Sequence, residues 1–509
     1  MTDERTAERA VKLSRERAKR AVAKYQTDSL PDSDFILSCL NANEAGDAEL
    51  AVLRLKNRFA FDRKQNAWFT YACSRWQKDI LNTVTTEARK QIILCYDAES
   101  RRQAALANDP RLDEEQRKKA ANIRDMINRR INAVNTAAKI SNILAIASSG
   151  DNSLAVSGDQ WDPDPYLLQA ENTVINLKTG MTQDPSPDLF ITAAAPALFK
   201  GLDEPAPEFQ KFLQSIFEDP EKAEYVQKIF GAAMIAKVIY HELYLFLGVD
   251  GRNGKSTLVN AISETLGDAL TRAISVEMLL DTKPKPGPNP ELLDLKGKRI
   301  LFASETAEGK RINSEGVKRL TGGDILSARP NYGNDIIQFR PTHSIFLQTN
   351  FLPRIPANDV ALWERIKIIN FPFRFVDSPK KENERPIDRS LADKLKAEKN
   401  GILTWLVQGC LKVQRDGLRP PLSVLAEINA QWTESDIIGQ FAEECVYESP
   451  GAKTLLRDIY GAFSEWCEEN TGQKPRMNSQ QFNRDFKRRY AAIPGKKPVA
   501  YADIKIYGA

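Results

Sequence analysis

The chain is poor in the residues that hold structural metal ions. Its 509 residues include two histidines and six cysteines, and no two cysteines form a Cys-x-x-Cys pair. A tetrahedral zinc site needs four such ligands close together, so we expect none here. Scattered, unpaired thiols are typical of a reducing compartment. We therefore expect a cytoplasmic location, in a bacterial cell or in a host cell.

Long apolar runs and a strong charge imbalance are missing as well. No stretch approaches the roughly 20 apolar residues that cross a bilayer, which predicts no membrane partner. The first residues, Met-Thr-Asp-Glu-Arg, are charged, unlike a signal peptide. The formal net charge of +4 permits a nucleic-acid partner but does not argue for one. Any prediction of DNA binding must therefore rest on local clusters.

The length favours several domains, and the composition, 42% hydrophobic and 28% charged, is ordinary for a globular protein. We predict a polar N-terminal arm (1–33), a mainly helical domain (34–205), an α/β domain (206–388), a helical connector (389–435) and a small α/β unit (436–509). The arm has two interpretations: a solvated helix, or a basic segment that touches DNA or a neighbouring subunit.

Two shorter patterns interrupt the helical prediction for the second region. Residues 59–71 alternate like a hairpin around Lys64-Gln-Asn66, and residues 172–180 read as a short strand followed by a turn. Helical spacing returns from Pro207 to Ile239.

Residues 240–375 alternate between strand and helix, which predicts an α/β fold with a parallel sheet. The expected strands are continuous apolar runs, as in sheets covered on both faces. They lie at 243–249, 299–304, 343–349 and 366–371, and helices follow residues 255 and 358.

A glycine-rich loop follows the first of these strands. Glycines let backbone N–H groups turn toward phosphate oxygens, and the N-terminus of the next helix adds partial positive charge. We assign the ATP-binding loop to Gly251, Arg252, Asn253, Gly254, Lys255, Ser256 and Thr257. Lys255 would reach the β- and γ-phosphates of ATP, and Ser256 would hold Mg²⁺. The alternative is a strand–turn–helix that happens to contain Gly-Lys-Ser.

The loop departs from the strict pattern G-x-x-x-x-G-K-[ST] by one position. Val249 stands where the first glycine belongs, and Gly248 lies one residue too early. The first glycine eases a turn rather than contacting the γ-phosphate, so this departure does not remove the groups that touch phosphate.

Polar residues also end two further predicted strands. Glu305 follows the strand 299–304 and could orient Mg²⁺ or polarise the attacking water, although a carboxylate at a strand end is common by chance. Asn350 ends the strand that begins near Thr342 and could contact the γ-phosphate or the water. Taken alone, an asparagine before a proline-containing turn is usually a turn former.

Three further residues are candidates for contacts outside the nucleotide pocket. Arg365 is either a surface charge or an arginine finger that reaches a neighbour's nucleotide. Between Glu305 and Asn350, residues 325–329 and 335–339 form a predicted hairpin. Its tip would present Arg329 to phosphates and Tyr332 to the face of a base, or be an ordinary surface turn.

The order of these motifs resembles the superfamily 3 helicases, in the phage/plasmid and poxvirus-type primase–helicase branch. The resemblance rests on Gly251-Arg-Asn-Gly-Lys-Ser-Thr257, Ser304-Glu305, Lys318-Arg-Leu-Thr-Gly-Gly-Asp324 and Gln348-Thr-Asn-Phe-Leu-Pro353. It extends from about residue 35 to the C-terminus, where the last unit is similar to a winged-helix-like domain.

This resemblance implies an AAA+-like P-loop motor that assembles into a hexameric ring and moves along single-stranded DNA. ATP and Mg²⁺ are the implied cofactors. Lys255, Glu305, Asn350 and Arg365 are the implied catalytic residues, Ser256 and Glu305 the metal ligands, and Lys318, Arg329 and Tyr332 the DNA contacts. Forked DNA, and a separate primase or replication initiator, are the implied partners.

The sequence also departs from the family pattern and leaves alternatives open. The strand end offers Ser304-Glu305 rather than paired carboxylates, and the first 240 residues lack an acidic primase constellation, so we do not expect primer synthesis. One alternative is a replication initiator or DNA-binding scaffold whose basic C-terminal residues bind duplex DNA: Lys474, Arg476, Lys487, Arg488 and Arg489. Another is a nucleic-acid translocase in packaging or defence.

Overall fold

The computed structural model describes residues 29–248, 251–281, 290–304, 310–329, 336–357, 359–471, 474–475, 477–495 and 497–507. The chain divides into two compact units. The first comprises Met1–Glu204, Glu264–Leu270 and Lys399–Val407, and the second comprises Pro205–Ser263, Thr271–Glu398 and Gln408–Ala509.

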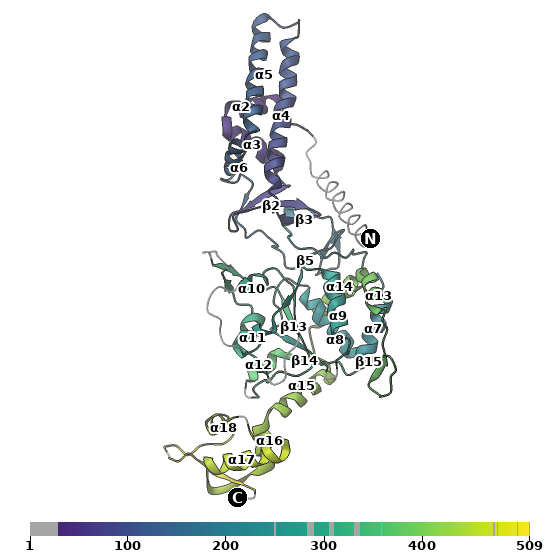
Figure 1. The fold of residues 1–509 in the computed structure, drawn as a ribbon, viewed down its shortest axis with the longest axis vertical. Helices are drawn as coiled ribbons and strands as arrows, with labels where there is room; N and C mark the ends of the chain where they lie inside the picture. The colour runs from purple at the N-terminus through teal and green to yellow at the C-terminus, as the bar shows by residue number, and fades with distance from the viewer. Residues whose placement is uncertain are drawn as a thin grey trace. The chain divides into compact units, whose positions relative to one another are not determined.

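Five helices open the first unit (Figure 1): α2 (Ser33–Asn41), α3 (Asn43–Leu55), α4 (Thr83–Ala107), α5 (Glu114–Val134) and α6 (Ala137–Ala147). The long helices α4 and α5 lie side by side. A capping box starts α5, in which the Asp113 carboxylate accepts from the Gln116 N–H and the Gln116 side chain accepts from the Asp113 N–H. A shared apolar core, including Leu50, Ile92 and Ile127, holds these helices together.

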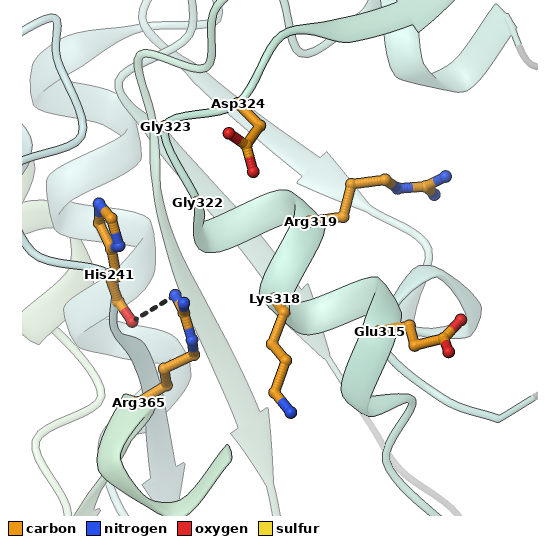
Figure 2. A pocket seen from close by; sticks show the side chains of 8 residues that line it. All are labelled: His241, Glu315, Lys318, Arg319, Gly322, Gly323, Asp324 and Arg365. Atoms are coloured by element: carbon orange, nitrogen blue, oxygen red, sulfur yellow. Dashed lines mark hydrogen bonds between the residues drawn. The ribbon is translucent and has the colours of Figure 1, made fainter. Parts of the chain in front are cut away.

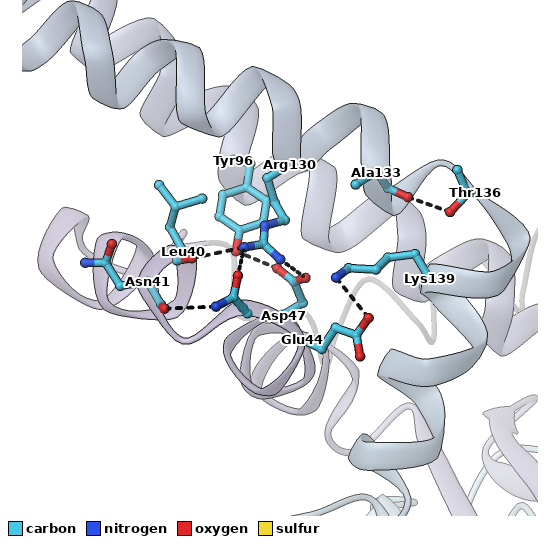
Figure 3. A network of polar contacts seen from close by, with 10 residues as sticks. Leu40, Asn41, Glu44, Asp47, Tyr96, Arg130, Ala133, Thr136 and Lys139 are labelled. Atoms are coloured by element: carbon cyan, nitrogen blue, oxygen red, sulfur yellow. Dashed lines mark hydrogen bonds and ion pairs between the residues drawn. The ribbon is translucent and has the colours of Figure 1, made fainter.

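A buried polar network ties four of these helices to one another (Figure 3). Asp47 on α3 is fully buried and accepts from the Tyr96 hydroxyl of α4 at 2.7 Å and from Arg130 Nη1 of α5 at 3.2 Å. Lys139 on α6 pairs with Glu44 on α3 at 3.0 Å. Burial raises the pKa of Asp47, and the bonds from Tyr96 and Arg130 oppose that rise.

The remainder of the first unit is built from short strands. A four-stranded sheet has the order β3-β2-β1-β4, and a three-stranded sheet has the order β5-β6-β7. The strands are β1 (Phe59–Asp62), β2 (Ala67–Ala72), β3 (Arg75–Lys78), β4 (Ala155–Val156), β5 (Leu167–Gln169), β6 (Val174–Asn176) and β7 (Thr182–Gln183), with a 3₁₀ turn, η1 (Pro187–Leu189). The hairpin predicted over 59–71 and the strand predicted over 172–180 are confirmed.

The helices expected in the region 34–205 end with α6, and the strand and turn expected at 172–180 belong to a longer stretch of strands. From residue 148 to residue 206 the chain forms strands and turns and contains no α-helix. Prolines such as Pro163 and Pro165 fix φ and remove backbone donors, which disfavours a helix here. An aromatic cluster takes over the role of packing, with Trp161 stacked on Phe69 at 4.7 Å between ring centroids.

The second unit is centred on a five-stranded parallel sheet with the order β14-β8-β13-β10-β9. Its strands are β8 (Leu243–Leu247), β9 (Thr271–Ile274), β10 (Ile300–Ser304), β13 (Ser344–Thr349) and β14 (Ile366–Asn370). The predicted parallel sheet and its four expected strands are confirmed, whereas the edge strand β9 was not predicted. Two of the four β9 residues are exposed, so it lacks the continuous apolar run that marks a central strand.

Aromatic packing fixes the centre of this sheet. The buried Phe346 ring on β13 stacks on Phe230 of the helix α8 (Pro220–Ala233) at 4.5 Å and on Tyr244 of β8 at 5.1 Å between centroids. Ring pairs at these distances stabilise a core beyond their buried area, by about 0.5–1.5 kcal/mol each. The helix α8 is therefore fixed against the two central strands.

Further elements surround the sheet. The helices are α7 (Pro207–Phe217), α8 (Pro220–Ala233), α9 (Lys255–Leu266), α10 (Pro290–Leu293), α11 (Ser314–Thr321), α12 (Val360–Arg365), α13 (Leu391–Ala397), α14 (Lys399–Asp416) and α15 (Leu422–Ser435), with a 3₁₀ turn, η2 (Val276–Met278). The additional strands are β11 (Leu326–Ala328), β12 (Ile337–Phe339), β15 (Arg374–Val376) and β16 (Glu384–Pro386).

The helix α15, expected to belong to a connector, packs against the sheet domain. Glu427 pairs with the buried Lys222 at 2.6 Å and accepts from the backbone N–H of Asn370 at 3.3 Å. Trp432 stacks on Trp363 of α12, with ring centroids 6.0 Å apart, and donates its indole N–H to the carbonyl of Ala357 at 3.1 Å. This helix is therefore an integral part of the sheet domain.

The last elements have the order α16 (Ile437–Cys445), β17 (Val446–Leu455), α17 (Leu456–Thr471), α18 (Ser479–Phe486) and β18 (Ala500–Ile506). Strands β17 and β18 pair antiparallel, and a separate apolar core, including Phe441, Phe463 and Phe482, lies among the helices. Across both units, none of the helices in the described ranges is long and apolar enough to cross a membrane.

The network around Asp47 predicts a large effect of removing its cation. Arg130→Ala leaves a buried carboxylate without its charge partner and should lower the free energy of unfolding of the helical region by about 3 kcal/mol. Arg124→Ala on the same helix is the matched control, because its pair with Asp125 is exposed and should matter by less than about 1 kcal/mol. Amide hydrogen exchange in α3 and α4 measures both, and equal effects would contradict the role of the network.

Candidate functional site

A loop at the carboxyl end of β8 is turned by left-handed backbone conformations. Gly251 has φ 66°, Arg252 φ 52° and Gly254 φ 86°, and α9 begins at Lys255. Glycine adopts these angles without steric cost. Such a loop directs free backbone N–H groups and a helix N-terminus toward one point, an arrangement suited to an anion. Residues 249 and 250 lie outside the described part of the chain.

The Lys255 ammonium group lies in this loop and donates three hydrogen bonds. Its acceptors are the carbonyl of Gly248 at 2.9 Å, Asn253 Oδ1 at 3.0 Å and Asn350 Oδ1 at 3.0 Å. The residue is only 7% exposed. Burial lowers the pKa of Lys255 from 10.5 to about 8, because none of its three acceptors carries a full negative charge.

Gly248, which seemed misplaced in the sequence pattern, lies directly beside this ammonium group. A Cβ at Gly248 would come within 2.6 Å of Lys255 Nζ and 2.7 Å of Asn253 Cγ. Only glycine leaves room for the two side chains here. The glycine therefore lets the lysine approach the end of its own strand closely. Its place in the loop differs from the usual sequence pattern by one residue.

The loop is also fastened to the chain that follows β14. The Asn253 side chain is buried and donates from Nδ2 to the carbonyl of Phe373 at 3.1 Å. The carbonyl of Arg252 accepts from the backbone N–H of Phe375 at 2.9 Å. These bonds hold the backbone of the loop in place before any ligand binds.

The ends of three neighbouring strands meet at the edge of the sheet that carries the loop. Thr349 is paired with Leu247, so Asn350 follows β13 at the level where the loop follows β8. On the next strand, Ser304 is paired with Gln348, whose Nε2 donates to Ser304 Oγ at 3.3 Å. The structure thus brings Lys255 and Asn350 into contact, whereas Glu305 lies outside the described residues.

Two more loop residues occupy the first turn of α9. Ser256 is exposed and Thr257 is partly buried. The Ser256 hydroxyl is therefore open to solvent next to the buried ammonium group of Lys255. A hydroxyl oxygen is a ligand type that Mg²⁺ accepts.

Arg365 lies at the opposite end of the strands, near the start of β8. It directly precedes β14, whose first residue, Ile366, pairs with the first residue of β8. The five residues of β8 separate the two ends by about 13 Å. Arg365 Nη1 donates to the carbonyl of His241 at 3.4 Å and to Thr321 Oγ1 at 3.3 Å. Within one chain, Arg365 and the loop are therefore at different ends of the strands.

A hollow of about 420 Å³ lies beside Arg365 (Figure 2). Its lining comes from α11, from the turn after that helix, from one residue before β8 and from Arg365. It is lined by His241, Glu315, Lys318, Arg319, Gly322, Gly323, Asp324 and Arg365. Three cations and two carboxylates share this surface, so it is only weakly basic.

Lys318, predicted to face DNA, has a partner within the chain. Its ammonium group pairs with Asp359 at 2.9 Å, and the two side chains are 35% and 21% exposed. Asp359 also caps α12, because its carboxylate accepts from the backbone N–H of Leu362 at 3.1 Å. Burial alone would raise the pKa of Asp359, but the bonds from Ser314 and Lys318 outweigh it and hold the pKa below its ordinary value.

The predicted hairpin is present. Strands β11 and β12 pair antiparallel, from Leu326 with Phe339 to Ala328 with Ile337. Arg329 is exposed directly after β11. Tyr332 and the rest of the turn lie outside the described residues.

Asp359 is the site residue that the sequence analysis missed. It precedes Val360, the first residue of a short helix, which is where an N-capping aspartate belongs. The cap was readable from the sequence. Its pairing with Lys318 was not, because 41 residues separate the two.

Comparisons with known proteins give a family for the first part of the chain. Residues 48–218 match the family described as D5 N terminal like. A protein named as a candidate helicase, L207/L206 of Acanthamoeba polyphaga mimivirus, is 29% identical over 331 residues, which is 62% of this chain and 34% of that protein. The chain spans about a third of the length of such relatives.

Other relatives come from further large DNA viruses. A second candidate helicase, 022R of Frog virus 3, is 27% identical over 59% of this chain and 31% of its own length. Primase D5 of Fowlpox virus is 25% identical over 35% of this chain and 23% of its own length. Among solved structures, an apo form of the NrS-1 C-terminal region is 11% identical, with a TM-score of 0.46 over 89% of this chain and 97% of that one.

The family match and these relatives confirm the predicted resemblance to the poxvirus-type primase–helicase branch of the superfamily 3 helicases. The family match begins within α3 and ends at Glu218, directly after α7. These relatives are named as helicases and as a primase, and each match covers only part of the relative's length.

The position of Gly248 predicts how the pKa of Lys255 responds to a single methyl group. Gly248→Ala should displace Lys255 Nζ toward solvent, because the contacted atoms are the ends of side chains rather than backbone. The pKa of Lys255 should then rise from about 8 toward its ordinary value. Competitive labelling with an amine-reactive reagent between about pH 7 and pH 11, read by mass spectrometry, measures this pKa.

The control for this experiment is Gly461→Ala, since a Cβ at Gly461 would meet no atom within 4 Å. It should leave the labelling profile of Lys255 unchanged. A Gly248→Ala protein in which the pKa of Lys255 is still about 8 would show that the glycine is not what admits the lysine.

Proposed function

We propose that this chain is the ATP-driven motor of a replicative DNA helicase that translocates on single-stranded DNA as a ring. The observation that carries the proposal is the set of bonds made by Lys255. Its ammonium group touches the end of β8 through Gly248, the glycine-rich loop through Asn253 and the end of β13 through Asn350. A phosphate that displaced these acceptors would change the hydrogen bonds of the loop and of the neighbouring strand together.

The residues present fit ATP with Mg²⁺. Lys255 is a buried cation whose three acceptors among the described residues are neutral. The N-terminus of α9 supplies oriented N–H groups, and the exposed Ser256 can supply a metal ligand. When bound, ATP with Mg²⁺ would supply a reactive γ-phosphate. Lys255 would hold the phosphates, and Asn350 would turn its amide from the lysine toward them.

Glu305 remains the proposed acidic catalytic residue. It follows Ser304 at the carboxyl end of β10, next to the strand that ends in Asn350. From this end of the sheet a carboxylate can orient the attacking water and help to hold the metal ion. The rest of the proposed loop, Gly251 to Thr257, would surround the phosphates of a bound nucleotide.

A ring of subunits gives Arg365 a role. Since Arg365 lies about 13 Å along the strands from its own loop, it would serve a neighbour's nucleotide. We therefore propose an assembly, a hexamer by resemblance to the family, in which ATP binds between subunits. An arginine donated in this way stabilises the charge that develops in phosphoryl transfer.

The hairpin β11–β12 is the proposed contact to single-stranded DNA. Arg329 is exposed at the start of its turn and can pair with phosphates, and Tyr332 can stack on a base. The setting we propose is the replication of a phage, a plasmid, an integrated mobile element or a large DNA virus. Forked DNA would be the substrate, and a separate primase or an initiator a partner.

The C-terminal elements favour a second candidate function, an ATP-regulated initiator that binds duplex DNA. Their order, α16-β17-α17-α18-β18, supports the winged-helix-like proposal. Lys487 is exposed directly after α18, whereas Arg484 and Arg489 are paired with Asp485 and Asp436. Strand displacement separates the two functions, because an initiator of this kind would bind a fork without unwinding it.

Lys255→Ala should abolish DNA-stimulated ATP hydrolysis and the unwinding of a forked duplex. The reason is that the Lys255 ammonium group bonds to both the loop and Asn350, and alanine leaves neither bond. Phosphate release and strand displacement are the measurements, with Lys453→Ala, on the distant strand β17, as a folded control. Full turnover by Lys255→Ala would remove this site from the proposal.

A test of the trans role of Arg365 mixes two inactive proteins. Arg365→Ala subunits and Lys255→Ala subunits should each hydrolyse little ATP alone. When mixed before assembly, some interfaces pair an intact loop with an intact arginine, so that hydrolysis should return to roughly a quarter of the wild-type rate. The absence of any recovery in mixed rings would count against a finger supplied by the neighbour.

A further inference from the structure

The helices α11 and α12 are joined at the N-terminus of α12. Asp359, the N-cap of α12, accepts from the hydroxyl of Ser314 and from Lys318 Nζ, two residues of α11. The same carboxylate accepts from the Leu362 N–H inside α12. One partly buried carboxylate thus joins two helices that are not adjacent in the chain, because β11, β12 and β13 lie between them.

A second bridge joins the C-termini of the same helices. Arg365, the last residue of α12, donates to Thr321 Oγ1, and Thr321 is the last residue of α11. The Thr321 hydroxyl in turn donates to the carbonyl of Val317 at 2.7 Å, which fixes its orientation. With both ends connected, α11 and α12 are held as one body.

This helix pair lies between the groups assigned to nucleotide and those assigned to DNA. Going along the chain, the segment from Asn350 to Asp359 leads from the Lys255 contact to α12. Its backbone is fastened midway, where Arg354 donates to the carbonyl of Lys310 at 2.7 Å and accepts from the N–H of Ile312 at 3.0 Å. In the other direction, α11 continues through Gly322 and Gly323 into β11.

The turn that leaves α11 is closely packed at Gly322, where a Cβ would come within 2.8 Å of the carbonyl oxygen of Lys318. A Cβ at Gly323 would meet nothing within 4 Å, so the turn is open there. Arg340 Nη1 donates to the carbonyl of Gly323 at 3.2 Å and links the turn to the far strand of the hairpin. A tilt of α11 would therefore displace the hairpin as a whole.

We propose that Asp359 is a positioning residue that couples nucleotide state to the DNA hairpin, by clamping α11 to α12 through Lys318 and Ser314. This inference rests on the proposed function. It assigns Lys318 to an internal ion pair, in place of the DNA contact that the family resemblance implies. A movement of Asn350 or of Arg365 then reaches β11 and β12 because α11 and α12 move together.

The charge of Asp359 can be removed while its cap is kept. Asparagine is as good an N-cap as aspartate, because its Oδ1 can still accept from the Leu362 N–H, while its Nδ2 can donate to the Ser314 hydroxyl. It cannot form an ion pair with Lys318. Asp359→Asn should therefore retain the fold, the basal ATP hydrolysis and the affinity for single-stranded DNA. The stimulation of hydrolysis by DNA should fall by about fivefold or more, the usual lower size of coupling between two sites.

A double-mutant cycle tests whether Lys318 acts through Asp359. Lys318→Gln should also reduce the stimulation by DNA, and the double variant Lys318→Gln/Asp359→Asn should be no worse than either single one. Arg329→Ala provides the contrast. It should weaken binding to a fluorescent oligothymidylate but leave the energetic coupling between Lys318 and Asp359 unchanged. A melting temperature that stays at the wild-type value in Asp359→Asn separates coupling from loss of fold.

The possible outcomes distinguish this inference from the function on which it rests. If wild type shows DNA-stimulated hydrolysis that depends on Lys255, and Asp359→Asn keeps the full stimulation, the coupling role is overturned while the motor stands. If Lys318→Gln weakens DNA binding as Arg329→Ala does, Lys318 touches DNA and the clamp is wrong. If wild type shows no stimulation that depends on Lys255, the proposed function itself fails.

Discussion

The site depends on one cation shared among three neutral oxygens. Lys255 is buried at the carboxyl edge of the parallel sheet, and its three acceptors come from the end of β8, from the loop and from the end of β13. Neutral acceptors satisfy its hydrogen bonds but do not repay its loss of hydration, which is why its pKa is lowered to about 8. The loop is held in shape around a charge that an anion would stabilise further.

Much of the surrounding structure serves this arrangement. The ring of Phe346 fixes β13 against β8, so that Asn350 and the loop end at the same level. The bonds that Phe373 and Phe375 make with the loop hold its backbone from the other side. Gly248 leaves the space in which the lysine can reach its own strand. Each of these contacts acts on the position of a single ammonium group.

The parts that could be predicted from the sequence were those with local signals. The four buried strands are continuous apolar runs, and the loop carries glycines before a helix that begins at Lys255. Local signals of this kind are missing in β9, which has two exposed residues. They are also weak in most of the strand-rich stretch after Ala147, where short strands lack a clear alternation. Pattern reasoning detects a strand through its burial, and these strands are marginal in that respect.

Long-range pairs account for what was missed at the site. The sequence places Lys318 in a box that resembles a DNA contact, yet Asp359, which lies beyond β13 in the chain, neutralises it. No periodicity connects two residues that meet only because a parallel sheet brings their helices together. The contact between Lys255 and Asn350 was within reach of sequence reasoning, because polar residues that follow neighbouring parallel strands share an edge.

The stacking of Trp432 on Trp363 has a consequence for how the molecule can be divided. The helix α15 looks like a spacer in the sequence, but it supplies Trp432 to the segment between Asn350 and Arg365 and Glu427 to the buried Lys222. A fragment that ended before Leu422 would leave one face of Trp363 bare and a buried ammonium group without its carboxylate. A fragment that keeps the packing of the sheet domain intact must therefore extend through α15.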